Sequence, residues 1–190
     1  MEIENIYWTW NKSLSLKFCN DIIKFAKSKR KNKGKVFNPT DVKSRKSNII
    51  WLNDEKWIYR ELQHYLKAAN KNAKWNFDIN SAESCQFTIY ENNQYYDWHK
   101  DMFEKPMKHN TNRKISLTLC LSDSNEYEGG DLQFAKDINP KEEKQIITSK
   151  NFRNKGSVVL FPSFIWHRVT PVTKGKRYSL VIWYNGPSFK

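Results

Sequence analysis

Apolar residues recur at helical spacing in two segments of the first half of the chain. Between Leu16 and Ser28 they fall on one face, and Ser15 is suited to cap the helix that this pattern predicts. The segment from Glu55 to Asn70 has a second apolar face of this kind, and Asn53 or Asp54 is expected to open that helix. Two such helices are expected to brace one face of a β-sheet.

From Ser84 onward the pattern changes to short runs of aromatic and β-branched residues separated by turn signals. These runs predict strands over Cys85 to Tyr90, Lys114 to Ser122, Leu132 to Ala135, Ser157 to Phe161, His167 to Val169 and Tyr178 to Tyr184. Many short strands after helices favour an α+β, mainly β fold, with a jelly roll (double-stranded β-helix, cupin-like) core that can hold a ligand between two sheets. In Glu128-Gly129-Gly130-Asp131 we expect the turn of a hairpin.

One predicted strand alternates in an unusual way. In Lys114 to Ser122, Ser116 and Thr118 share one face with Cys120, whereas leucines occupy the other face. The leucine face is expected to pack, and the polar face to line a pocket.

No repeat and no low-complexity linker divides the 190 residues. We therefore expect a single domain over residues 1–190, with 1–83 as a helical support region and 84–190 as the jelly-roll core.

The chain is strongly basic, with a formal net charge of +13. Such a charge is suited to an acidic partner, nucleic acid included. However, lysines are spread along the whole chain, and the densest basic cluster, from Lys24 to Lys35, is typical of a helix end followed by a solvated loop. Charge alone therefore disfavours a nucleic-acid partner without excluding it.

The three cysteines, Cys19, Cys85 and Cys120, are widely spaced and include no Cys-x-x-Cys pair. They fit neither a zinc knuckle nor a disulfide framework, which favours a reducing cytoplasm. The N-terminus lacks the pattern of a secretion signal, and no apolar run reaches the length of a membrane span. We expect a cytoplasmic protein with no membrane partner.

His99, Asp101 and His167 carry the clearest candidate chemistry. Two imidazoles and one carboxylate on one face of an octahedron leave three positions free, the arrangement of non-haem Fe(II) oxygenases. His99 and Asp101 point to the same side if their segment is extended, and His167 must then come from a strand that is distant in sequence and adjacent in space. The alternative is that either histidine is a hydrogen-bonded core or surface residue.

Arg177 follows His167 by ten residues and opens the last predicted strand. Its guanidinium is expected to lie between the sheets, where a bidentate carboxylate would be its natural partner. A salt bridge to an Asp or Glu of the core is the alternative.

These motifs resemble the prolyl-4-hydroxylase branch of the 2-oxoglutarate and Fe(II) dependent dioxygenases. The resemblance runs through Leu14 to Ile23, Tyr90, His99-Lys100-Asp101, Glu128 to Leu132, Gly156 to Pro162, His167 and Arg177, and so covers most of the chain. It implies that His99, Asp101 and His167 bind iron and that Arg177 binds the distal carboxylate of 2-oxoglutarate.

The resemblance also implies roles for residues around this centre. Tyr90 matches a tyrosine whose hydroxyl contacts the co-substrate, although an aromatic core residue is an equal alternative. Ser116 or Thr118, together with Leu132, match pocket-lining positions. Arg113 and Trp183 fall where relatives line the substrate groove, and Trp98 is a further candidate; a structural role is the alternative for each of the three.

Two comparisons within the wider superfamily narrow the choice of reaction. Halogenating relatives replace the carboxylate ligand with a small residue, so the presence of Asp101 favours hydroxylation. Alkylation-repair relatives carry a second arginine where this chain has Trp183, which disfavours nucleic-acid demethylation. The charged segment from Asp137 to Asn154 matches no part of the family pattern.

The function that the resemblance implies is hydroxylation of an unactivated C–H bond, coupled to decarboxylation of 2-oxoglutarate to succinate and CO2. Fe(II), 2-oxoglutarate and O2 would be required, with ascorbate as a possible reductant. A prolyl residue of a peptide or protein is the expected substrate, and a free amino acid, another small molecule or nucleic acid is the alternative. A non-catalytic metal- or sugar-binding jelly roll is the alternative outside enzymes, and the oligomeric state is left open.

Overall fold

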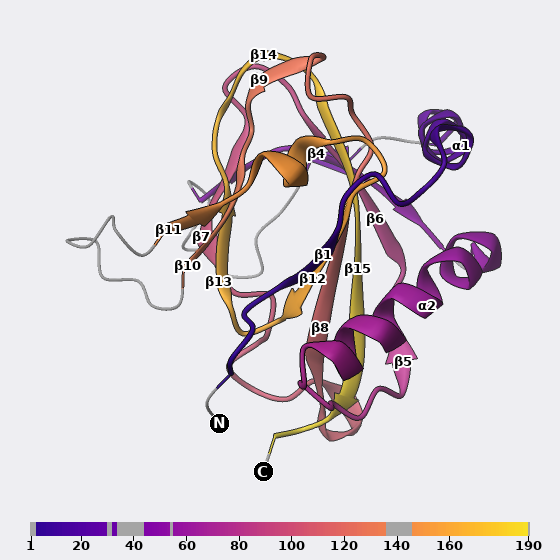
Figure 1. Cartoon of the computed structure of the whole chain (residues 1–190), viewed down its shortest axis with the longest axis vertical. Coiled ribbons are helices and arrows are strands. Elements are labelled where there is room, and N and C mark those ends of the chain that lie inside the picture. Colours follow the sequence, from indigo (N-terminus) through magenta and orange to yellow (C-terminus); the bar gives the residue numbers. More distant parts are fainter. Residues whose placement is uncertain (1–2, 30–31, 34–43, 54, 136–145, 190) are drawn as a thin grey trace.

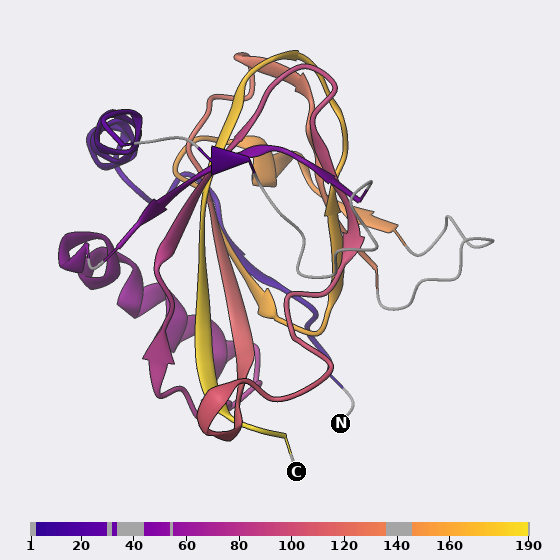
Figure 2. The ribbon, with the colours of Figure 1, turned by 180° about the vertical axis from the view of Figure 1, so that it is seen from behind.

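Two packed β-sheets, a separate two-stranded sheet and two α-helices make up the computed structural model, which describes residues 3–29, 32–33, 44–53, 55–135 and 146–189. The helices are α1 (Leu16–Lys27) and α2 (Lys56–Asn72), with short 3-10 helices η2 (Lys108–Asn110) and η4 (Lys150–Arg153). Both α-helices lie on the same side of the molecule, away from the smaller sheet (Figures 1 and 2). This arrangement confirms the predicted jelly roll with helices on one sheet.

The larger sheet has the strand order β1-β12-β8-β15-β6-β4-β2, and β5 also pairs with β15. Its strands are β1 (Trp8–Trp10), β2 (Asn32–Lys33), β4 (Asn48–Leu52), β5 (Ser81–Ala82), β6 (Cys85–Tyr90), β8 (Thr111–Cys120), β12 (Val158–Pro162) and β15 (Arg177–Pro187). The smaller sheet has the order β11-β10-β13-β7-β3. Its strands are β3 (Arg45–Lys46), β7 (Tyr95–His99), β10 (Leu132–Ala135), β11 (Ile146–Thr148) and β13 (Trp166–Val169).

The apolar faces predicted for the two helices are buried against the larger sheet. Ser15 caps α1, because its hydroxyl accepts a hydrogen bond from the backbone N–H of Phe18 at 3.1 Å. Helix α2 begins one residue after Glu55 and has no side-chain cap, so Asn53 does not cap it, and Asp54 lies outside the described residues. Within the described ranges, no helix is long and apolar enough to cross a lipid bilayer.

Each face of the larger sheet contributes to a different core. On β8, Leu117 and Leu119 join the helix-side core with residues of α1, α2, β4 and β6. Ser116 and Thr118 point to the other side, toward the smaller sheet, as their alternation predicts. Between the sheets a second core contains Phe134 and Phe161. The space beside that second core is where the predicted site residues meet.

The segment from Glu128 to Asp131 does not form the predicted hairpin. Strand β9 (Tyr127–Gly129) pairs with β14 (Val172–Gly175) in a separate sheet, whereas β10 pairs with β11 and β13. Gly129 and Gly130 have φ values of +68° and +63°, a conformation that glycine adopts readily. The two glycines therefore turn the chain from one sheet into another.

Residues 1–83 contribute strands as well as helices to the fold. Strand β1 pairs with β12, and β4 pairs with β6, so both strands extend the larger sheet that contains β8 and β15. The support region that we predicted from helical periodicity is thus continuous with the jelly roll.

Candidate metal centre and adjoining cavity

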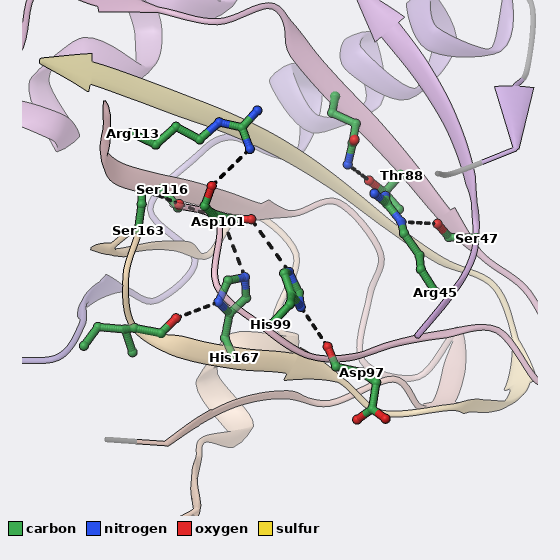
Figure 3. A network of polar contacts seen from close by, with 12 residues as sticks. Arg45, Ser47, Thr88, Asp97, His99, Asp101, Arg113, Ser116, Ser163 and His167 are labelled. Carbon is green, nitrogen blue, oxygen red and sulfur yellow. Dashed lines mark hydrogen bonds and ion pairs between the residues drawn. The ribbon is translucent and has the colours of Figure 1, made fainter. Parts of the chain in front are cut away.

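His99 and His167 lie opposite each other on two neighbouring strands. His99 is the last residue of β7, and the antiparallel register of β7 and β13 pairs it directly with His167 (Figure 3). Asp101 follows in a bend rather than in an extended strand, and its backbone N–H donates to the carbonyl of Ser163 at 2.9 Å. The expected strand adjacency is confirmed, whereas a bend, and not the alternation of a strand, brings Asp101 to the histidines.

The three side chains converge on one point. Nε2 of His99 lies 3.7 Å from Oδ1 of Asp101, and Nε2 of His167 lies 3.5 Å from Oδ2. Each residue offers one donor atom, and these atoms all lie within 4.8 Å of one another. Two imidazole nitrogens and a carboxylate oxygen at this spacing are able to share one metal ion.

Backbone carbonyls orient both imidazole rings. Nδ1 of His99 lies 2.7 Å from the carbonyl oxygen of Asp97, and Nδ1 of His167 lies 3.0 Å from that of Ile165. A carbonyl oxygen accepts only, so each Nδ1 donates to its carbonyl and each Nε2 is turned toward Asp101. Hydrogen bonds of this kind are typical around metal-binding histidines.

The charge state of the cluster suits a divalent cation. Burial, followed by the nearby His167, lowers the pKa of His99 to about 3, so this imidazole is neutral at neutral pH. Burial alone would raise the pKa of Asp101, but the combined effect of His167, His99, Arg113 and a hydrogen bond from Ser116 is larger, so the pKa is lowered. A neutral imidazole beside an ionised carboxylate is the protonation state that metal binding requires.

Two serines and an arginine hold Asp101 in place. The Ser116 hydroxyl donates to Oδ2 of Asp101 at 2.7 Å and lies 2.9 Å from the Ser163 hydroxyl. Arg113 donates to the carbonyl oxygen of Asp101 at 3.3 Å. The Arg113 guanidinium is itself fixed by a bidentate pair with Glu83, at 2.7 and 2.6 Å. These contacts leave Oδ1 of Asp101 facing His99.

A narrow cavity extends from the three donors between the sheets. Its lining includes Arg45, Tyr90, Tyr96, Thr118, Leu132, Phe161, Val169, Arg177, Ser179 and Trp183. Most of these residues come from β6, β8 and β15 on one side and from β7, β10 and β13 on the other. The cavity thus lies in the centre of the jelly roll, as the fold predicts.

Arg177 supplies a cationic group to this cavity. Its side chain is 97% buried, since only 3% is exposed, and one of its nitrogens donates to the Ser179 hydroxyl at 3.2 Å. Its Nε makes no hydrogen bond, and no carboxylate of the described residues forms an ion pair with it. Among the described residues, Arg177 therefore does not form the core salt bridge that was the alternative. A buried guanidinium with free donors is suited to the carboxylate of a ligand.

The structure brings most of the predicted site residues together. Tyr90, Thr118, Leu132 and Trp183 line the cavity, and Ser116 contacts Asp101. Arg113 lies at its edge, 4.0 Å from the centre of the Trp183 ring.

Trp98 is the exception among them. It neighbours His99 on β7, so its side chain points to the opposite face, where it packs on Arg168 at 4.6 Å. It does not line the cavity.

The sequence analysis missed several residues of the site, including Ser179, Tyr96, Ser163 and Arg45. Ser179 could have been found, because it lies two positions after Arg177 on the same face of β15. Tyr96 stacks on His99 with ring centroids 3.4 Å apart, and Ser163 and Arg45 reach the site from other segments. No spacing in the sequence points to these three.

The fold and the donor set together define a jelly-roll protein with a two-histidine, one-carboxylate metal-binding cluster. The chain belongs to the 2OG-Fe(II) oxygenase superfamily, whose sequence profile matches residues 85–185 and so includes all three donors and Arg177. Fe(II), 2-oxoglutarate and O2 are the metal and the co-substrates of this family. The donor set fits Fe(II), and the unpaired guanidinium of Arg177 fits a dicarboxylate.

One curated relative is a PKHD-type hydroxylase of Teredinibacter turnerae, 37% identical over 100 residues, in a match that covers 52% of this chain and 41% of that protein. The chain thus spans less than half of that relative's length.

Solved structures show the same fold at low sequence identity. The viral collagen prolyl hydroxylase of Paramecium Bursaria Chlorella virus-1, solved as a 2OG complex, has a TM-score of 0.70 at 21% identity, covering 96% of this chain and 97% of that one. A prolyl hydroxylase from Trichoplax adhaerens, in complex with a hypoxia inducible factor peptide fragment, has a TM-score of 0.66 at 20% identity, covering 95% and 84%. These likenesses establish the jelly-roll fold.

Proposed function

We propose that this protein is an Fe(II)- and 2-oxoglutarate-dependent hydroxylase. The observation that carries the proposal is the presence, in one cavity, of three converging metal donors and a buried guanidinium without a counter-ion. A metal-binding module that does no chemistry has no need of the second feature, because an unpaired buried charge is costly to keep.

His99, Asp101 and His167 are the residues that would hold the iron, and Arg177 would bind the distal carboxylate of 2-oxoglutarate. When bound, Fe(II) supplies the redox chemistry that couples decarboxylation of 2-oxoglutarate to hydroxylation of a C–H bond. Ser179 keeps the guanidinium of Arg177 oriented through its 3.2 Å contact. Tyr90 and Thr118 line the same cavity and are proposed to contact the co-substrate.

The apolar residues of the cavity lining limit the access of water to the metal donors. Leu132, Phe161 and Val169 form an apolar wall beside the donors, which excludes water from the reacting groups. Ser116 keeps one carboxylate oxygen of Asp101 occupied, so that the other remains available to the metal. The protein thus positions the reacting groups and excludes water, and it supplies neither a nucleophile nor a general acid.

We further propose that the substrate is a prolyl residue in a peptide or protein. The support is the aromatic and cationic edge formed by Trp183 and Arg113, together with prolyl hydroxylases among the proteins of similar fold. Trp183 lines the cavity, where its indole is able to contact an apolar prolyl ring, and Arg113, held by Glu83, stacks on the indole and fixes its position. A free amino acid is the alternative substrate.

The test is oxygen-dependent conversion of 2-oxoglutarate to succinate by the purified protein with Fe(II). We expect His99→Ala, Asp101→Ala and His167→Ala each to abolish conversion, because a cluster with a donor missing cannot hold iron productively. His64→Ala is the matched control, since His64 is exposed on α2 and should leave turnover unchanged. Wild-type turnover in any of the three donor variants would rule out the site.

The substrate is tested separately by mass spectrometry of peptide, amino-acid and nucleic-acid panels. The expected product is a proline-containing peptide heavier by one oxygen atom. Oxygen added only to free amino acids or only to nucleic acid would reject the prolyl assignment while leaving the oxygenase assignment intact.

A further inference from the structure

A second and larger hollow lies on the opposite side of the molecule from the metal donors. It has a volume of about 620 Å³ and runs between α2 and the chain that leads from Phe77 into β5. Helix α2 and strand β5 lie together on the flank away from β7 and β13 in both views (Figures 1 and 2). Its volume falls in the range of small-molecule sites. We call this hollow the α2–β5 groove.

The floor of the α2–β5 groove is apolar and aromatic. Tyr59, Leu66, Phe77, Ile79 and Tyr184 contribute to its lining. Leu66, Phe77 and Tyr184 also belong to the helix-side core and are at most 8% exposed, so the floor is part of a rigid framework. An apolar ligand body would find a preformed surface there.

One wall of the groove is basic. Lys56, Arg60 and Lys67 line it together with Gln63, and these four residues recur at intervals of four, three and four along α2. That spacing places them on one stripe of the helix. No acidic residue lines the groove, and none of the three cations forms an ion pair with a carboxylate of the described residues. The wall therefore has positive charge that is available to a ligand.

Tyr184 joins the groove to strand β15 of the larger sheet. Its side chain is 5% exposed, it lines the groove, and its hydroxyl makes no hydrogen bond within the described structure. A buried hydroxyl without a partner is uncommon, because its desolvation is not offset. The neighbouring Tyr59 hydroxyl, by contrast, donates to the carbonyl oxygen of Glu83 at 2.7 Å.

We propose that the α2–β5 groove binds a small amphipathic organic anion, with an apolar body on the aromatic floor and a carboxylate, sulfonate or phosphate group against Lys56, Arg60 and Lys67. This site is separate from the metal cavity, because Tyr184 faces the groove whereas the preceding residue, Trp183, faces the cavity. The proposal does not rest on the oxygenase assignment.

The probe is anilinonaphthalene sulfonate, an anion with an aromatic body whose fluorescence rises on binding. We expect saturable binding to the wild-type protein, and Lys67→Glu should raise the Kd by about tenfold because it reverses one charge of the basic wall. Lys24→Glu is the matched control: Lys24 is exposed on α1, does not line the groove and undergoes the same change of charge, so the Kd should change by less than about twofold. Circular dichroism checks that both variants are folded.

The neutral analogue phenylnaphthylamine tests the charge directly. We expect it to bind more weakly than the sulfonate and to be insensitive to Lys67→Glu. The proposal is overturned if the sulfonate shows no saturable binding, if both lysine variants change its Kd equally, or if only an acidic peptide binds and the small anion does not.

Discussion

Ser116 and Ser179 each orient one charged group of the cavity through a single hydrogen bond. Ser116 donates to Asp101 at 2.7 Å, and Ser179 accepts from Arg177 at 3.2 Å. Removal of the Ser116 hydroxyl is therefore expected to affect metal binding, and removal of the Ser179 hydroxyl to affect co-substrate binding.

We predict that Ser116→Ala weakens Fe(II) binding by about tenfold, as expected when a partner of a metal ligand is removed. Ser179→Ala should instead raise the KM for 2-oxoglutarate several-fold, because a hydrogen bond worth about 1 kcal/mol is lost, and it should leave the metal affinity unchanged. Anaerobic metal titration and steady-state kinetics measure the two constants. Each variant is the control for the other, and identical effects of both on metal affinity would contradict the assignment.

Some residues of this site could be predicted from the sequence, and others could not. His99, Asp101, His167 and Arg177 were recognisable because their types and spacing are unusual together. Ser163 had no such signal, since its contact with Ser116 depends on the pairing of β8 with β12. Proximity that arises only from strand pairing is not encoded in local spacing.

Among the elements, the corner between β9 and β10 lies beside the Arg177 end of the cavity. A Cβ at Gly130 would lie 2.8 Å from Cγ2 of Val172 and 3.0 Å from Cδ of Arg177. A Cβ at Gly129 would instead overlap the backbone carbonyl of Pro171. Both positions have positive φ, but only one of them contacts the guanidinium side chain.

We predict that Gly129→Ala and Gly130→Ala each lower the free energy of unfolding by about 1 kcal/mol or more, because alanine is strained at positive φ. Gly130→Ala should in addition raise the KM for 2-oxoglutarate, whereas Gly129→Ala should not. Urea unfolding and steady-state kinetics give the two quantities. A KM increase confined to Gly129→Ala would refute the proximity argument.

Element by element, the sequence predicted those segments whose own pattern is strong. Strands β6 and β10 were predicted at their observed bounds, and both α-helices within two residues of them. Strands β1, β4 and β7 are among those that were missed. Trp8–Trp10 is too short to show alternation, and the pairing of β4 with β6 is a long-range contact that a local pattern does not report.

On the scale of the whole molecule, the helix-side core joins both parts of the chain. Side chains of α1, α2 and β4 pack there with those of β6, β8 and β15. We therefore propose that residues 1–190 fold as one domain, and we predict that a fragment of residues 84–190 does not fold cooperatively, because it would expose one whole face of the larger sheet. Urea unfolding followed by circular dichroism tests this, with the full chain as control. A sigmoidal transition of the fragment with native-like aromatic signals would contradict it.

The direct pairing of His99 with His167 has a thermodynamic consequence for the protein as a whole. An ion held by both imidazoles would fasten β7 to β13, two strands that the chain itself connects only through a long excursion across both sheets. Such an ion would bind the native state and not the unfolded chain, so its free energy of binding would add to the stability of the smaller sheet. The metal would then act as a cross-link as well as a reagent, and the resistance of this fold to unfolding would vary with the supply of iron.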